Sequence, residues 1–476
     1  MPMQARTTFS HLITRAQTLT LPFALCAGLL TASATAQASP TIEQWTTIDG
    51  ARVQFVESHA LPMIDIQVDF AAGSALDPAD KAGLAALTRA LLDAGTAELD
   101  EQAIADRSAD IGARIGGGTE EDRSSLSIRS LSSPAERDAA VALAAELLSR
   151  PSFPAEVLKR ERARAIAGLN EALTQPATLA NRRFSAAIYA GHPYGGLRTP
   201  ESLAAIARDD LIAFHRAHYG ANRASIAIVG DLDRAAAERL ALTLTRDLPR
   251  TAAPEPLPAP AMPAAATLHI PHPSAQAHIL LGQPGMARED PDYFPLLVGN
   301  YVLGGGGFVS RLTSEVREKR GFAYSVYSYF APQQVAGPFQ IGLQTRGGQV
   351  DQALQVVRDT LDGFVADGPT DAELQAAKDN IVNGFGLRLD SNAKILGYVS
   401  MIGFYRLPLT WLETYPRAVA AVTADQVRDA FARRIRPEHL VTVIAGGDGD
   451  GEAGAASGAN AGGAEAPAAA PAGAER

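Results

Sequence analysis

Residues 304–325 read GGGGFVSRLTSEVREKRGFAYS. The stretch predicts a glycine-rich turn, a charged helix over 314–319 and a strand over 323–329. Gly321 separates the helix from the strand, and the chain can turn there because glycine tolerates backbone conformations closed to other residues. The four glycines are not followed by the Lys-Ser/Thr pair of a phosphate-binding loop, so the pattern does not predict nucleotide binding.

A proline-rich segment lies upstream of this stretch and divides the chain. Residues 250–267 (RTAAPEPLPAPAMPAAAT) have a composition that favours an extended, semi-rigid linker. The linker separates a first half, residues 41–249, from a second half, residues 268–445. We therefore expect two folded domains joined by this linker.

The two halves resemble each other in sequence. Residues 153–157 (FPAEV) correspond to residues 370–374 (TDAEL), and residues 225–231 (SIAIVGD) correspond to residues 440–446 (LVTVIAG). Both pairs are offset by about 217 residues, which indicates an internal duplication.

The pattern within each half predicts an α+β fold. Apolar and polar residues alternate over 63–70, as in a half-buried strand, and apolar residues recur at helical spacing over 138–148 and 351–364. Strands and helices are segregated rather than strictly alternating. This arrangement favours two sandwiches, each a mostly antiparallel sheet packed with helices, over a doubly wound parallel sheet.

The composition of the 476 residues excludes several classes of protein. Hydrophobic residues make up 46% and charged residues 20%, close to globular averages, so the chain can form a large core. A formal net charge of −10 argues against nucleic acid or an anionic membrane surface as a partner. Cys26 is the only cysteine, which excludes a disulfide framework and a cysteine-rich zinc site.

The two ends are expected to lie outside the fold. Residues 1–38 have the basic start, the apolar run over 19–30 and the small-residue cleavage pattern of a secretory signal. The apolar run is shorter than the roughly 20 residues of a stable membrane span, so we expect export to a bacterial periplasm. An uncleaved anchor and a lipoprotein attached through Cys26 are the alternatives. Residues 446–476, rich in Gly and Ala, are expected to be a disordered tail.

Five motifs together resemble a known family. They are HPYG at 192–195, TPESL at 199–203, FHRAHY at 214–219, IVGD at 228–231 and the stretch 304–325. The ensemble is similar to the insulinase-like (pitrilysin) zinc metallopeptidases, in the short two-domain form of bacterial members and mitochondrial processing peptidases. The resemblance covers about residues 45–445. It implies two homologous insulinase-like domains that form a clam-like chamber.

Active members of that family hold zinc with His-x-x-Glu-His on a helix, because histidines at i and i+4 share one face. The glutamate of the motif is the general base, and a later glutamate completes the metal site. In the matching stretch 83–96 (GLAALTRALLDAGT), Ala86 and Ala90 replace the histidines and Arg89 replaces the base. The later glutamate position falls on Gly168. We therefore expect no metal on this chain and no peptidase activity from the chain alone.

The second half keeps the positions that the resemblance assigns to substrate binding. Arg317 and Tyr324 match the pair that reaches the active site of the first domain and binds substrate carbonyl groups. A guanidinium and a phenol are hydrogen-bond donors suited to a developing oxyanion. A glycine run beside them lets the backbone approach an extended peptide, with a merely flexible connection as the alternative. These glycines are Gly304, Gly305, Gly306 and Gly307.

The asymmetry between the halves predicts a division of labour. We expect a non-catalytic subunit that forms a heterodimer with a homologous chain carrying His-x-x-Glu-His, with zinc on that partner and peptides as substrates. Residues 116–119 (GGGT) depart from the Asn-Ala of active members at the substrate-pairing edge strand, which weakens substrate binding by the first half. The alternative is a peptide-binding or scaffold protein without a proteolytic role.

Other polar residues are expected to be structural. Arg89 and Asp93 have the i,i+4 spacing of a helical ion pair. His215 and His218 form His-x-x-His without a nearby third ligand, and His192 precedes a proline as a capping or loop residue.

Overall fold

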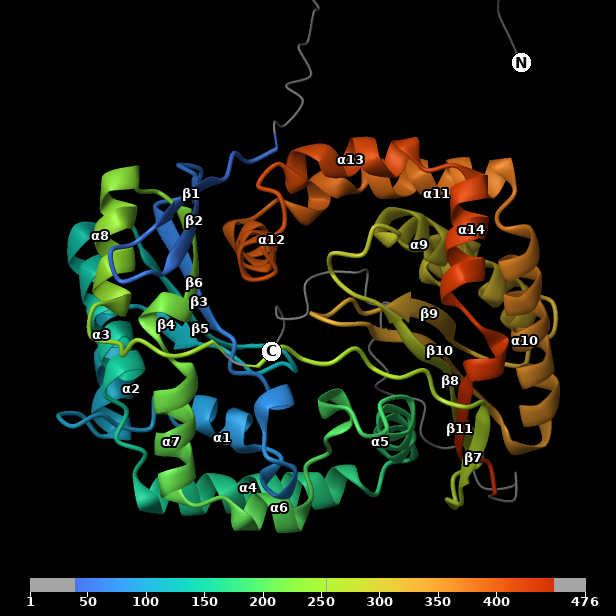
Figure 1. The fold of residues 1–476 in the computed structure, drawn as a ribbon, viewed down its shortest axis with the longest axis horizontal. Helices are drawn as coiled ribbons and strands as arrows, with labels where there is room; N and C mark the ends of the chain where they lie inside the picture. Colours follow the sequence, from blue (N-terminus) through green and yellow to red (C-terminus); the bar gives the residue numbers. More distant parts are fainter. Residues whose placement is uncertain (1–38, 254, 449–476) are drawn as a thin grey trace, which may run out of the picture. The chain divides into compact units, whose positions relative to one another are not determined.

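The first half of the chain forms a six-stranded sheet (Figure 1). The computed structural model describes residues 39–253 and 255–448, so the expected signal segment and nearly all of the expected tail lie outside the described residues. The strand order is β1-β2-β6-β3-β5-β4, with β2 and β6 parallel and the other neighbours antiparallel. The strands are β1 (Glu43–Thr46), β2 (Arg52–Glu57), β3 (Met63–Phe70), β4 (Arg114–Gly116), β5 (Ser124–Leu131) and β6 (Ser225–Gly230).

The second half forms a five-stranded sheet on the same plan. Its order is β7-β11-β8-β10-β9, and β11 runs parallel to β7 and antiparallel to β8, as β6 does to β2 and β3. The strands are β7 (Ala266–Ile270), β8 (Gln276–Met286), β9 (Val326–Phe330), β10 (Gly337–Arg346) and β11 (Val441–Gly446). The second sheet therefore repeats β2 to β6 of the first, as the duplication predicts.

The helices also repeat between the halves. At one constant sequence spacing, α4, α5 and β6 are followed by α11, α12 and β11. A capping box between Thr370 and Glu373 begins α11. The helices of the described residues are α1 (Leu84–Ala90), α2 (Glu101–Ile111), α3 (Pro134–Ser149), α4 (Ala155–Ala172), α5 (Pro176–Ile188), α6 (Pro200–Ala205), α7 (Arg208–His218), α8 (Arg234–Thr245), α9 (Tyr293–Asn300), α10 (Val350–Asp367), α11 (Asp371–Asn383), α12 (Asn392–Phe404), α13 (Trp411–Ala421) and α14 (Ala424–Arg434).

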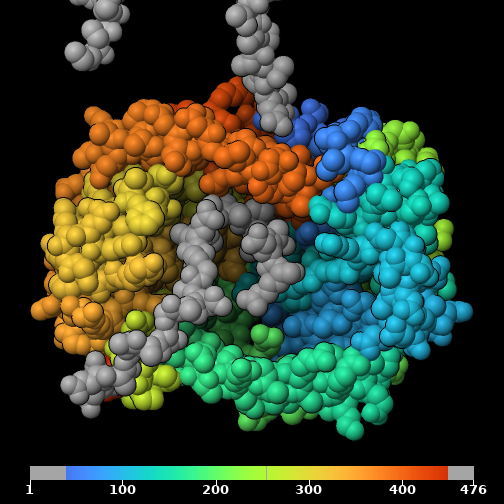
Figure 2. Space-filling model, turned by 180° about the vertical axis from the view of Figure 1, so that it is seen from behind, coloured from blue at the N-terminus to red at the C-terminus, as the bar shows by residue number. Residues whose placement is uncertain are grey.

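Each sheet is covered on one face by a helix from the other half. Helix α12 packs against β2, β3 and β6, and α5 packs against β8 and β11 (Figure 1). Phe184 and Ile188 of α5 share an apolar cluster with Leu280 and Val443 of the second sheet. Seen from behind, the second half (yellow to orange) meets the first half (blue to green) on either side of a hollow (Figure 2). Burial of the exchanged helices stabilises the two halves against separation.

The exchange explains where the sequence pattern was incomplete. Strand β3 has the bounds that alternation predicted, but Asp65 and Asp69 on its polar face are buried as well, at 5% and 0% exposed. Alternation predicts that the polar face of the strand is exposed to solvent, whereas here α12 covers that face.

The stretch 304–325 differs from its predicted secondary structure in detail. The expected helix is a π-helical turn over Thr313–Glu318, and the expected strand begins only at Val326. Tyr324 therefore lies in the loop before β9. Within the described residues, no helix has the length and apolarity needed to cross a membrane.

Candidate functional site

Helix α1 carries three of the four positions that bind zinc or act as base in active relatives, and Asp77 fixes its start. Gly83 precedes the helix with a φ of 108°, a left-handed conformation that favours glycine. The Asp77 carboxylate accepts hydrogen bonds from the backbone N–H groups of Gly83 and Ala85, both at 2.7 Å. Burial raises the pKa of Asp77 to about 6, although these hydrogen bonds act in the opposite direction.

The positions expected to replace zinc ligands do not fit a metal. Ala86 is half-buried and Ala90 exposed on α1, and Gly168 is exposed on α4. Methyl groups and a hydrogen atom offer no donor to zinc. Among residues 39–253 and 255–448, no group of three or more His, Cys, Asp or Glu side chains could hold a metal ion.

Arg89, at the position of the general base, turns into the protein. Its side chain is buried, and its Nε donates to the backbone carbonyl of Ser125 on β5. A Cβ at Gly117 would lie 2.7 Å from its guanidinium, so the glycine leaves room for the arginine. Burial lowers the pKa of Arg89, while Asp93 and Tyr219 act in the opposite direction. Arg89 therefore fills the space between α1 and the β4–β5 edge.

The predicted ion pair between Arg89 and Asp93 does not form within the described part of the chain. Asp93 acts on Arg89 only through longer-range attraction. The physical reason is that the arginine finds its hydrogen-bond acceptor on β5, across the helix–sheet contact, and not one turn along its own helix.

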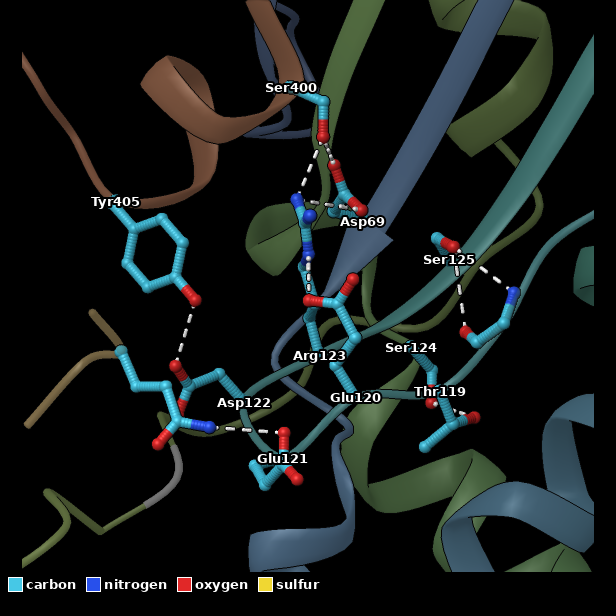
Figure 3. A network of polar contacts seen from close by, with 12 residues as sticks. Asp69, Thr119, Glu120, Glu121, Asp122, Arg123, Ser124, Ser125, Ser400 and Tyr405 are labelled. Carbon is cyan, nitrogen blue, oxygen red and sulfur yellow. Dashed lines mark hydrogen bonds and ion pairs between the residues drawn. The ribbon is translucent and has the colours of Figure 1, made fainter. Parts of the chain in front are cut away.

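A buried polar network follows the β4–β5 turn and reaches the second half (Figure 3). The Arg123 guanidinium donates to Glu120 at 3.0 Å and to the Ser400 hydroxyl at 2.8 Å, and it lies 3.5 Å from Asp69. Burial acts to lower the pKa of Arg123, but the Asp69 and Glu120 carboxylates outweigh it and raise the pKa. Because Ser400 belongs to α12, the network joins the two halves.

Asp122 forms a second junction beside the first. Its carboxylate accepts from the Tyr405 hydroxyl at 2.9 Å (Figure 3). It also accepts from the Tyr194 hydroxyl and from the Gln334 backbone N–H at 2.8 Å. Tyr194 belongs to the first half, and Tyr405 and Gln334 belong to the second. The β4–β5 loop of the first half is thus tied to the second half.

Internal packing explains why three of the four positions in the glycine run are glycine. A Cβ at Gly304, Gly305 or Gly306 would lie 2.4 to 2.7 Å from atoms of Ser328, Asn300 or Tyr301, so these glycines are required by close contacts and not by flexibility. Gly307 has a φ of 61°, and a Cβ there would meet no described atom within 4 Å. Only Gly307 has open space in front of it, and a role of the run in substrate binding stays a prediction.

Arg317 and Tyr324 lie together on the surface, with a third residue that sequence reasoning missed. The Arg317 guanidinium carbon lies 5.0 Å from the ring centre of Tyr324 and 4.9 Å from that of Phe308. Tyr324 is 82% exposed and Phe308 70% exposed. An aromatic residue directly after the glycine run was the available signal. Stacking of this kind stabilises the guanidinium position by about 0.5–1 kcal/mol at an exposed site.

Two of the histidines expected to be structural, His215 and His192, are hydrogen-bonded to the protein. His215 is buried and its Nε2 lies 2.8 Å from the Leu148 carbonyl oxygen, while burial lowers its pKa. His192 Nδ1 accepts from the Tyr194 backbone N–H at 3.1 Å, as a capping residue does.

The comparisons with known proteins bear on this geometry. Models of "Insulinase (Peptidase family M16)" and "Peptidase M16 inactive domain" match residues 52–199 and 205–381. A crystal structure of a peptidase M16 inactive domain from Pseudomonas fluorescens is 40% identical, with a TM-score of 0.82, over 85% of this chain and 97% of that one. A non-peptidase homolog from Helicobacter pylori is 25% identical, over 83% of this chain and 91% of that protein.

Other relatives are named as proteases and match less of their length. An uncharacterized zinc protease of Streptomyces coelicolor is 32% identical over 50% of this chain and 53% of that protein. A second, from Mycobacterium leprae, is 30% identical over 55% of this chain and 60% of that protein. The match thus spans between half and two thirds of these two curated relatives. The resemblance and the α+β fold expected from the sequence are confirmed, and the chain belongs to the insulinase family (peptidase family M16) as a non-catalytic member.

Proposed function

We propose that this chain is the non-catalytic subunit of an exported insulinase-like endopeptidase. It forms a heterodimer with a homologous chain that carries His-x-x-Glu-His and zinc, and it contributes Arg317 and Tyr324 to the binding of peptide substrates. The observation that carries the proposal is the contrast between two arginines. Arg89 is buried at the position expected for the base, while the Arg317 guanidinium lies beside the exposed rings of Phe308 and Tyr324.

The chemistry proposed for this chain is hydrogen-bond donation. The partner's zinc supplies the Lewis acid. The Arg317 guanidinium and the Tyr324 hydroxyl bind the substrate carbonyl oxygen and stabilise the negative charge that develops on it. Phe308 is a positioning residue, because its ring contacts the same guanidinium as the Tyr324 ring does and restricts its orientation.

The first experiment is to purify the exported chain from its own host and to identify co-eluting chains by mass, with zinc measured in each. We expect about one zinc per heterodimer and a similar-sized second chain with His-x-x-Glu-His. Zinc bound by this chain alone would contradict the proposal. Absence of any partner would favour the alternative, a peptide-binding or scaffold protein.

Turnover of an unfolded peptide by the reconstituted pair then tests the residues. Phe308→Leu is expected to lower kcat with a smaller effect on KM, since the leucine keeps the apolar contact but removes the cation–π contact. Arg320→Ala is the matched control, because Arg320 lies on the same segment and pairs with Glu315 at 2.7 Å. A Phe308→Leu pair with the turnover of the control would remove Phe308 from the site.

A further inference from the structure

A pocket of about 380 Å³ lies at the junction of β2, the segment after α12 and the linker. Its lining includes Arg52, Arg223, Arg288 and Arg406, together with apolar surface from Leu257 and Phe404. We propose that this pocket binds a small, multiply charged oxyanion, a phosphate or carboxylate compound, through Arg52, Arg223 and Arg406. The site is separate from Arg317 and does not depend on the proposed function.

The four arginines lack counter-charges close at hand. Within residues 39–253 and 255–448, none of their guanidinium groups lies within 4.0 Å of a carboxylate, whereas arginines such as Arg123, Arg160 and Arg433 form such pairs. Burial lowers the pKa of Arg52, and the like charges of Arg406 and Arg223 lower it further. Three cations that repel one another beside a pocket are stabilised when an anion binds among them.

Two of the arginines also present hydrogen-bond donors without acceptors. The Nε atoms of Arg223 and Arg288 are buried and have no partner among the described residues. A buried donor that stays unsatisfied costs roughly 1–3 kcal/mol of stability, so such groups are rare unless something else binds them. An oxyanion in the pocket offers several acceptor atoms to these donors.

The third arginine, Arg406, has a strained backbone conformation. Arg406 has a φ of 57°, one of two non-glycine residues with positive φ among those described. It directly follows Tyr405, whose hydroxyl donates to Asp122. This left-handed conformation is disfavoured for a side chain with a Cβ, and strain of this kind concentrates at ligand sites.

Four acidic residues also line the pocket, and two of them are already held by hydrogen bonds. Asp122 accepts from three donors and Glu121 accepts from Gln333 at 3.1 Å, so both carboxylates are already engaged. Glu255 and Glu289 also line the pocket. Since Arg52, Arg223 and Arg406 line the pocket and none has a described carboxylate within 4.0 Å, this side of the pocket is the cationic side, and a bound anion belongs there.

Arginine suits phosphate and carboxylate alike, because its planar fork can donate two parallel hydrogen bonds to either group. The pocket volume lies within the range of about 300–1,000 Å³ typical of small-molecule sites. A multiply charged anion is favoured over a singly charged one, since three guanidinium groups surround it.

The test is calorimetric titration of the full exported chain in low-chloride buffer, with inorganic pyrophosphate in one arm and citrate in the other. We expect saturable binding of one anion per chain in at least one arm, and the responding arm identifies the phosphate or the carboxylate source. Arg52→Gln and Arg223→Gln should each weaken binding at least about tenfold, since each removes a charge-assisted hydrogen bond. Arg417→Gln, an exposed arginine paired with Glu413, is the control and should leave affinity unchanged.

A second variant separates an anion site from a merely structural cluster. Arg406→Gly relieves the positive φ and removes one of the repelling charges, so it should raise the Tm without anion while weakening anion binding. No binding in either arm up to millimolar concentration would overturn the proposal. Binding that survives Arg52→Gln and Arg223→Gln, or a lower Tm for anion-free Arg406→Gly, would overturn it as well.

Discussion

The region around α1 in the first half and the stretch 304–325 in the second half treat an arginine in opposite ways. Arg89 is buried, donates to the Ser125 carbonyl and occupies space that Gly117 leaves open. The half-buried Arg317 has its guanidinium beside the exposed rings of Phe308 and Tyr324. The same side chain thus serves packing in one region and is available for contact in the other, and burial is what decides between the two roles.

Two capping carboxylates show the same contrast. Asp77 is half-buried and accepts from the backbone at the start of α1, and its partial burial raises its pKa to about 6. Glu373 begins α11 and accepts both hydrogen bonds of the Arg311 fork at 2.7 Å, which lowers its pKa to about 2. The first carboxylate is held by neutral backbone donors, while the second is paired with a cation from the stretch 304–325.

The largest expected effect tests whether the first-half region has become structural. Arg123→Ala leaves the buried carboxylate of Asp69 and the half-buried carboxylate of Glu120 without their cation. We expect the free energy of unfolding to fall by about 3–5 kcal/mol, measured by chemical denaturation. Arg417→Ala, at an exposed pair, should change it by no more than about 0.5 kcal/mol. A loss of similar size for both would mean that the network does not join the halves.

The next largest effect concerns the exposed stretch. In the reconstituted pair, Arg317→Ala should lower kcat/KM, since it removes an oxyanion donor. The expected loss of transition-state stabilisation is about 2–4 kcal/mol. Arg317 is half-buried and contacts two exposed rings, so we expect an unfolding free energy within about 1 kcal/mol of the parent chain. A large loss of stability with unchanged turnover would reverse the comparison and make Arg317 the structural arginine.

Sequence reasoning captured what depends on local periodicity. The strand at 63–70 was predictable, because the spacing of apolar residues along one element determines it. The assignment of Ala86, Arg89 and Ala90 to zinc and base positions came from the family resemblance and stays a prediction. Burial of Asp69 was not predictable, since the helix that covers it comes from the other half of the chain. The contact of Arg89 with Ser125 depends on space left by Gly117, which is visible only in three dimensions.

The pH dependence of stability should differ between the two capping carboxyls. The folded-state pKa of Asp77 lies above its ordinary value of 3.8, so the folded chain binds more protons and stability falls as pH rises from about 4 to 6. Asp77→Asn should flatten this pH dependence. The fall in the free energy of unfolding between about pH 4 and 6 should shrink by at most about 3 kcal/mol, since a tenfold change in proton affinity corresponds to about 1.4 kcal/mol.

Glu373 provides the control of opposite sign. Its lowered pKa contributes stability that is present above pH 4.5 and is lost as pH falls toward about 2. Glu373→Gln should therefore flatten the acid side of the unfolding curve and leave the range from about 4.5 to 6 as it was. Equal effects of the two variants across the whole range would contradict the contrast between the regions.

The smallest expected effect concerns Arg89 itself. If the arginine only fills space, then Arg89→Met, which keeps the length and removes the buried charge, should change the free energy of unfolding by no more than about 1 kcal/mol, because the lost hydrogen bond to Ser125 is offset by the desolvation that is no longer needed. Arg89→Ala should cost more, about 2 kcal/mol, since it leaves a cavity. Chemical denaturation of both variants gives the two free energies of unfolding and shows whether the volume or the charge of Arg89 matters. A methionine variant as unstable as the alanine variant would show that the charge of Arg89, and not its volume, holds α1 against β5.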